Sequence, residues 1–162
     1  MPSTLDMVAE FSRTFGYPVN DEPGVPESVD SHCDGARWQI ASSIRAVERE
    51  AKALSKATGD PCMLRLRLIL EELRELADAM ADHNAKGALD ALCDIRYVCD
   101  GTTHLLGMGA VFDEAMRRVH ASNMSKAGPD GKPIHDATGK LLKGPHYSPP
   151  DLTDLVAPKG TR

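Results

Sequence analysis

The sequence has few aromatic residues and no long apolar run. Phe, Tyr and Trp make up 4% of its 162 residues, whereas hydrophobic residues together make up 41%. The core must therefore be built mainly from Leu, Ile, Val, Ala and Met, a composition that favours helices over strands. No apolar stretch approaches the roughly 20 residues of a membrane-spanning helix. We therefore expect no membrane association.

A basic excess is also missing. Lys and Arg number 19 against 24 Asp and Glu, which gives a formal net charge of -5. Proteins that bind nucleic-acid polymers usually carry a basic excess, so we expect no such partner. Residues 1–4 lack the basic and apolar regions of a signal peptide, which predicts a cytoplasmic protein.

The four cysteines follow no metal-binding or redox pattern. None belongs to a C-x-x-C pair or to the spacing of a zinc site. Cys93 and Cys99 lie in an apolar helical stretch, and we expect both to be buried free thiols.

Helical periodicity organises the middle of the chain. Apolar residues recur at steps of three and four, which predicts helices over residues 35–57, 61–82, 88–107 and 110–124, after a short helix over 3–15. Asp60 and Pro61 are typical of the N-cap and the first residue of a helix. The Gly- and Pro-rich residues after Lys126 predict turns, with a small hairpin around Ile134 and Leu141.

The most informative residues are the carboxylates of two successive predicted helices. Glu72 and Glu75 stand at i and i+3, and Glu71 and Glu75 at i and i+4, so all three share one helix surface. Asp90 and Asp94 repeat the i, i+4 spacing in the next helix. Like charges at these spacings repel, whereas a divalent cation such as Mg²⁺ takes oxygen ligands of this kind. Two antiparallel helices can bring both sets together as a metal site.

A solvated acidic face is the competing interpretation. For Glu71, Asp78 and Asp82, a solvated acidic face is a better interpretation than a metal site. Glu72, in contrast, continues a partly apolar stripe, and Asp94 lies in an apolar segment, where an unpaired carboxylate is costly. The predicted metal ligands are Glu72, Glu75 and Asp94, with Glu71 and Asp90 as additional ligands.

Cationic and amide side chains after the fourth long helix form the other half of the predicted site. Asn123 and Lys126 close that helix, and Lys140 and Lys143 follow in the Gly-rich tail. Lysines on flexible backbone can grip phosphates. A solvated lysine is the ordinary alternative, and residues 138–140 do not form a Walker loop, because the upstream glycine spacing is missing.

The carboxylates of the two helices, followed by the Asn and Lys residues after them, resemble the motifs of a known family in their order along the chain. Residues 71–75, EELRE, are similar to the EExxE element of the all-α NTP pyrophosphohydrolases, the MazG-like superfamily. The second family element reads ExxD: Asp94 matches its Asp, Ala91 stands at its Glu, and Asp90 is the candidate substitute one residue earlier. Residues 94–102, 119–126 and 130–150 resemble further segments of the phage-type branch.

The resemblance implies an all-α, MazG-like helical bundle and hydrolysis of a nucleoside triphosphate to the monophosphate and pyrophosphate. Its implied segments are an N-terminal helix and loop over 1–34, a catalytic core over 35–126 and a turn-rich tail over 127–162. It also implies two or more Mg²⁺ ions per site, replaceable by Mn²⁺, with one of Glu71, Glu72 and Glu75 taking the proton of the attacking water. The implied substrate-binding residues are Asn123, Lys126, Lys140, Lys143, Tyr97 and Tyr147.

A homo-oligomer with a four-helix core, either a dimer or a tetramer, is expected on two grounds. The family pairs its subunits, and the apolar stripes of residues 35–57 and 61–82 are too long to remain in water on a monomer. If a phage encodes the chain, its location is the host cytoplasm.

Several functions remain open at this point. A purine deoxynucleotide such as dGTP or dATP is the favoured substrate, and dUTP or dCTP on the same scaffold is the nearest alternative. A phosphoribosyl-ATP pyrophosphohydrolase is less favoured. The alternative outside enzymes is a helical dimerisation or regulatory module whose acidic face is only solvated.

Overall fold

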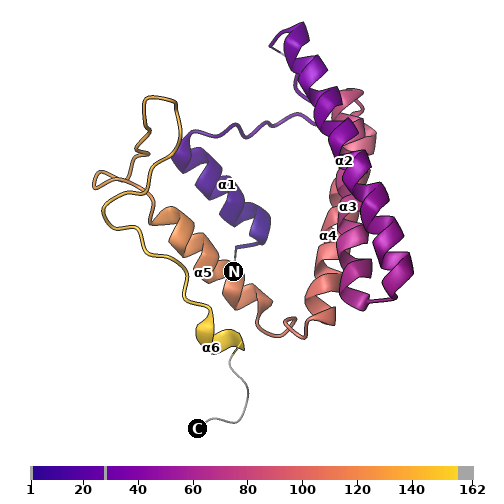
Figure 1. The fold of residues 1–162 in the computed structure, drawn as a ribbon. Helices are drawn as coiled ribbons and strands as arrows, with labels where there is room; N and C mark the ends of the chain where they lie inside the picture. The colour runs from indigo at the N-terminus through magenta and orange to yellow at the C-terminus, as the bar shows by residue number, and fades with distance from the viewer. Residues whose placement is uncertain (1, 28, 157–162) are drawn as a thin grey trace. The chain divides into compact units, whose positions relative to one another are not determined.

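The structure is a computed structural model that describes residues 2–27 and 29–156. Figure 1 shows the helices. They are α1 (Thr4–Phe15), α2 (Ser31–Thr58), α3 (Pro61–Ala81), α4 (Ala85–Leu105), α5 (Phe112–Met124) and α6 (Thr153–Val156). The described residues contain no β-strand, and an isolated antiparallel bridge joins His135 to Leu141. The predicted all-α class is therefore confirmed.

Side-chain caps set the helix ends, and two of them move a boundary that periodicity predicted. The carboxylate of Asp30 accepts hydrogen bonds from the backbone N–H groups of His32 and Cys33, so α2 begins at Ser31 rather than at residue 35. The side chain of Asn84 accepts a hydrogen bond from the N–H of Gly87, and α4 begins three residues earlier than predicted. These first turns carry no apolar stripe, so periodicity alone misses them.

The start of α3 agrees with the prediction. Asp60 is the N-cap and accepts hydrogen bonds from the N–H groups of Cys62 and Met63, at 2.6 and 3.3 Å. Pro61 occupies the first helical position, and Gly59 closes α2 in the left-handed conformation at φ 62°. This tight turn makes α2 and α3 antiparallel neighbours.

Backbone contacts divide the chain into two compact units, which are described separately. One is Glu22–Leu106 and contains α2, α3 and α4; the other combines Met1–Asp21 with Gly107–Arg162 and contains α1, α5 and α6. The division into 1–34, 35–126 and 127–162 stays a prediction.

In the unit of Glu22–Leu106, α3 packs against both α2 and α4, and small side chains fill the contacts. The buried apolar residues there are Ala41, Ala51, Ala79, Ala81, Ala88 and Ala91. Several large side chains lie mostly outside these contacts: Ile40 is 60% exposed and Leu92 is 52% exposed. Cys93 is exposed and Cys99 is only partly buried, so their predicted burial is wrong, although both are free thiols as expected. Cys93 fails the prediction because the α3–α4 contact is made by alanines on another side of α4.

In the second unit, α1 packs against α5, and aromatic rings cluster at the end of α1. Phe15 is 2% exposed, and the ring of Phe11 lies 4.5 Å from that of Phe15 and 5.9 Å from that of Tyr17, centre to centre. The predicted small hairpin is present as the bridge between His135 and Leu141, with hydrogen bonds from the Leu142 N–H to the Ile134 carbonyl and from the Asp136 N–H to the Lys140 carbonyl.

None of the helices in residues 2–27 and 29–156 combines the length and apolar character needed to cross a lipid bilayer.

Candidate active site

Two close approaches fix how α3 and α4 align. A Cβ atom built on Gly87 of α4 would lie 3.3 Å from the Cβ of Ala79, and one built on Gly101 would lie 3.0 Å from Nη1 of Arg65. The two contact positions are fourteen residues apart on each helix (79 − 65 and 101 − 87). Midway between them, seven residues from each contact, Glu72 of α3 is level with Asp94 of α4.

The electrostatics of Glu72 agree with this alignment. Partial burial raises the pKa of the Glu72 carboxyl, and the negative charges of Glu75, Asp94 and Glu71 raise it further, while Arg74 opposes them. Within the described part of the chain, neither Glu72 nor Asp94 has a hydrogen-bonding or ion-pairing partner for its side chain. The two carboxylates therefore face each other across α3 and α4 without an ion pair of their own, and Arg74 acts on Glu72 only through its charge.

The other two glutamates of the EELRE segment are held by arginines of the same helix. Nη2 of Arg67 lies 2.6 Å from the Glu71 carboxylate, and Nη2 of Arg74 lies 2.7 Å from that of Glu75. Arg74 also reaches Asp78, which pairs in turn with Arg45 of α2. These ion pairs fix the side chains of α3 around Glu72.

Helix α4 supplies fewer carboxylates to the surroundings of Glu72 than α3 does. Ala91 is level with Glu75 and is 2% exposed in the contact between α3 and α4. Asp90 is exposed, and its charge is not among those that raise the pKa of Glu72. The structure thus places Glu71, Glu75 and Asp94 near enough to raise the pKa of Glu72, and leaves Asp90 at the margin.

Across residues 2–27 and 29–156, no three His, Cys, Asp or Glu side chains converge closely enough to form a metal site. The donor set nevertheless fits a hard cation. Carboxylate oxygens are the ligands that Mg²⁺ prefers, and a cation would relieve the repulsion that raises the pKa of Glu72.

The predicted phosphate-binding residues lie in the other unit. Nζ of Lys126 donates a hydrogen bond of 2.8 Å to the side-chain oxygen of Asn123. Lys143 lies over the ring of Tyr147, 4.2 Å from its centre, and Lys140 is exposed after the turn, immediately before Leu141. Tyr97 belongs to α4 and is 80% exposed.

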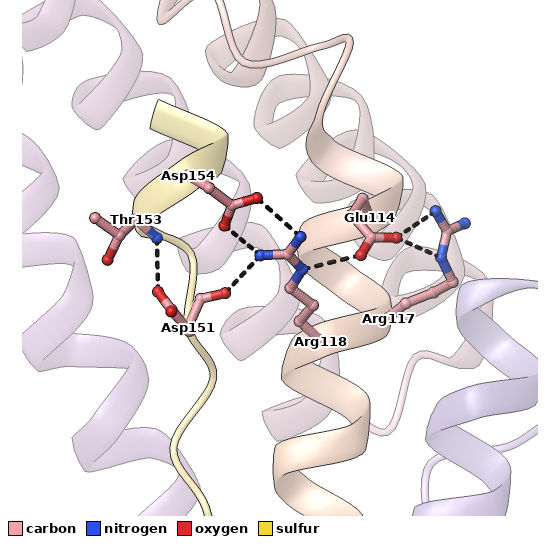
Figure 2. Close-up of polar contacts among 6 residues, drawn as sticks. All are labelled: Glu114, Arg117, Arg118, Asp151, Thr153 and Asp154. Carbon is pink, nitrogen blue, oxygen red and sulfur yellow. Dashed lines mark hydrogen bonds and ion pairs between the residues drawn. The ribbon is translucent and has the colours of Figure 1, made fainter. Parts of the chain in front are cut away.

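The tail returns along α5, and three sets of contacts hold it there. The N–H of Gly144 bonds to the carbonyl of Lys126, and the N–H of Ser148 bonds to the hydroxyl of Ser125, at 2.9 and 3.0 Å. Figure 2 shows the third set, in which Arg118 bonds to the Asp151 carbonyl and to both carboxylate oxygens of Asp154. Lys143 is thereby brought back beside the end of α5, next to Lys126.

Two residues of the helical unit were not predicted. Glu48 is only 8% exposed on α2, where it continues the stripe of Ile44 and Ala51. Arg65 lies on α3 seven residues before Glu72. The signal for both was present, since each stands at helical spacing from a residue already singled out.

The phosphoribosyl-ATP pyrophosphohydrolase family model matches residues 43–123, half of the chain. The chain belongs to this family. The matched segment runs from within α2 to the end of α5 and includes Glu71, Glu72, Glu75, Asp90, Asp94, Tyr97 and Asn123. Lys126, Lys140, Lys143 and Tyr147 lie beyond it. The family region therefore contains all the candidate carboxylates and little of the basic tail.

Individual relatives extend this picture. An uncharacterized protein, L479 of Acanthamoeba polyphaga mimivirus, is 34% identical over 105 residues. That match takes in 65% of this chain and spans 29% of the viral protein. A crystal structure of a candidate NTP pyrophosphohydrolase from Exiguobacterium sp. 255-15 has a TM-score of 0.53 and 23% identity, and covers 95% of this chain and 92% of that one. At this identity the likeness establishes a shared fold.

Proposed function

We propose that the chain hydrolyses a nucleoside triphosphate to the monophosphate and pyrophosphate. The preferred substrate is a purine deoxynucleotide such as dGTP or dATP, as in the phage-type branch that includes the enzyme MazZ. The observation that carries the proposal is the pair of Glu72 and Asp94, which face each other across α3 and α4 while neither forms an ion pair within the described residues. Family membership over residues 43–123 supports the reaction class.

The reaction needs an acceptor for one proton. A water oxygen bonds to the α-phosphorus while the bond from that phosphorus to the bridging oxygen breaks, and pyrophosphate leaves with the electron pair. One of Glu71, Glu72 and Glu75 takes the proton of the water. The pKa of Glu72 is moved upward, the direction that makes a carboxylate a better base near neutral pH.

The carboxylates also fit the metal requirement of this chemistry. Mg²⁺, or Mn²⁺ in its place, would neutralise phosphate charge and activate the water when bound. The residues proposed to hold it are Glu72, Glu75 and Asp94, with Glu71 and Asp90 as additional ligands. Asn123, Lys126, Lys140, Lys143, Tyr97 and Tyr147 are proposed to contact the substrate.

The family match favours one second candidate substrate. Phosphoribosyl-ATP, for which the family is named, offers the same bond between α- and β-phosphates as a nucleoside triphosphate. The same carboxylates would serve either substrate, because the two differ away from the triphosphate, where phosphoribosyl-ATP carries an additional phosphoribosyl group that the protein must accommodate.

We further propose that the active form is a homo-oligomer, a dimer or a tetramer. The helical unit buries mainly alanines, whereas Ile40, Val47, Leu66 and Leu92 are about half exposed or more. Covering the exposed half of each such side chain contributes about half of the roughly 1.5–3 kcal/mol that full burial gives. A second copy with the same stripes is the partner that symmetry favours.

A pyrophosphate-release screen tests the function. The full chain is assayed with Mg²⁺ or Mn²⁺ against all natural dNTPs and NTPs and against phosphoribosyl-ATP, and the products are separated by ion-exchange chromatography. We expect a monophosphate and pyrophosphate in equal amounts, with dGTP or dATP hydrolysed fastest, and no product with EDTA. Release of a diphosphate and inorganic phosphate, or no turnover of any of these substrates, would contradict the proposal.

A further inference from the structure

Arg65 lies on the same seam between α3 and α4 as the facing carboxylates. It precedes Glu72 by seven residues on α3, and Gly101 follows Asp94 by seven residues on α4, about two helical turns in each case. A Cβ atom on Gly101 would lie 3.0 Å from Nη1 and 3.6 Å from Cζ of Arg65. The guanidinium therefore rests against the bare backbone of α4, two turns from the Glu72–Asp94 pair.

Arg65 has no carboxylate of its own, unlike the other arginines of α3 and α4. Within residues 22–27 and 29–106, no acidic side chain forms an ion pair or hydrogen bond with it. Each of the following arginines of the same unit pairs with an Asp or Glu: Arg45, Arg67, Arg74 and Arg96. A guanidinium is charged at every physiological pH. Arg65 is therefore a partly buried, permanent cation that is available to an external anion.

The order of charges along the seam matches a polyphosphate. At one point stand the two carboxylates proposed to serve the reacting phosphate, and two turns away stands a cation. Tyr97, exposed on α4, lies between Asp94 and Gly101 on the same helical face. A guanidinium presents a planar fork of donors that fits phosphate oxygens in pairs.

We infer that Arg65 binds the terminal phosphates of the substrate, the part that leaves as pyrophosphate. The inference rests on the proposed function, and it names the residue that recognises the leaving group. It also explains Gly101: a side chain at this position would occupy the space that the guanidinium uses.

The test measures pyrophosphate binding and hydrolysis in the full-length chain. Arg65→Met keeps the length of the side chain and removes its charge. We expect it to weaken calorimetric binding of Mg²⁺-pyrophosphate and to raise KM for the triphosphate about 10- to 100-fold, the range for losing hydrogen bonds to a charged group. Arg65→Lys should recover part of this loss. Arg96→Met, which removes an exposed arginine paired with Asp100 on α4, is the matched control and should bind pyrophosphate like the unmodified chain.

Gly101→Ala is a second variant in case Arg65→Met fails to fold. It displaces the guanidinium without removing it, and should raise KM less than Arg65→Met does. The inference would be overturned if Arg65→Met left pyrophosphate affinity and KM unchanged, or if Arg96→Met weakened binding as much as Arg65→Met does. If Arg65→Met does not fold, unchanged affinity and KM in Gly101→Ala would overturn it. A chain that hydrolyses no triphosphate, but binds pyrophosphate through Arg65, would contradict the proposed function and leave this assignment standing.

Discussion

At the scale of single residues, Glu72 stands out because its environment penalises its charge. Desolvation and three neighbouring carboxylates raise its pKa, and one arginine opposes them. Such a carboxylate costs stability when ionised and is kept for another reason, which under the proposed function is catalysis.

We therefore expect Glu72→Gln to separate activity from stability. The change should lower kcat about 10²- to 10⁴-fold, the contribution of a positioned acid–base group. Without metal at neutral pH it should unfold at the same temperature or a higher one, because the repulsion is gone. That gain should shrink as the pH falls through the raised pKa, where Glu72 is itself neutral.

Paired kinetics and thermal melts in EDTA measure both effects. Asp82→Asn provides a control at the C-cap of α3, because Asp82 is exposed and lies outside the proposed site. Full activity of Glu72→Gln with unchanged Mg²⁺ dependence would mean that the site is wrongly placed.

Arg118 is the second residue whose surroundings determine its role. Hydrogen bonds from Arg118 lower the pKa of Asp154, and Arg118 together with Arg117 lowers that of Glu114. Carboxyl groups with lowered pKa values contribute stability above the ordinary carboxyl range and lose it as the pH falls through the lowered values. The contact between the tail and α5 should hence be complete at neutral pH.

Arg118→Ala should release residues 148–156 and make them several-fold more sensitive to limited proteolysis at pH 7. The unmodified chain should show the same sensitivity only in acid, below the usual carboxyl range, as judged with an acid-active protease. Arg96→Ala removes a local i, i+4 pair instead and should leave the tail protected. Equal digestion of both variants would contradict a specific role for Arg118.

At the scale of elements, the helices could largely be predicted from the sequence, and their ends only where a cap was visible. Asp60 and Pro61 mark the start of α3 unambiguously, whereas the first turn of α2 has polar residues and depends on the Asp30 carboxylate. The short α6 escaped prediction because four residues carry too little periodicity.

The carboxylate site was predictable to the extent that it is local. Glu71, Glu72 and Glu75 follow from spacing on one helix, but the pairing of Glu72 with Asp94 depends on the packing of α3 against α4. That packing is set by Gly87 and Ala79, whose significance appears only when the helices meet. Arg65 was overlooked for the same reason.

The crossing of the tail over α5 depends on Gly144. A Cβ atom there would lie 2.1 Å from the carbonyl oxygen of Ala127, which is part of the backbone and cannot move aside freely. Gly144→Ala should therefore destabilise the crossing by about 1–3 kcal/mol, as overpacking does. It should also mimic a chain that ends at Lys126, in which we expect intact helices and weak nucleotide binding.

Circular dichroism and nucleotide titrations compare the two variants with the full chain. Gly35→Ala in α2 meets nothing within 4 Å and serves as the control. Normal nucleotide affinity in the truncated chain would reduce the tail to a linker.

At the scale of the whole molecule, the helical unit has an inner surface of alanines and an outer surface of larger apolar residues. A continuous apolar surface of this kind is rarely left in water on a monomer. We expect sedimentation equilibrium at micromolar concentration to give a mass two or four times 17.5 kDa. Leu92→Glu, on the exposed side of α4, should shift the distribution towards the monomer. A monomer that still hydrolyses nucleotide would contradict both the assembly and a site shared between subunits.

The alanine contacts have a further consequence for how the protein folds. Alanine loses no side-chain rotamer freedom when it is buried, so three helices can align through these contacts at little entropic cost. They also gain little, because a methyl group removes little apolar area from water. The three helices would then order first, within one chain. The large side chains would be buried in a separate event, when two chains associate. The melting temperature should accordingly rise with protein concentration, as mass action requires of a fold completed by association.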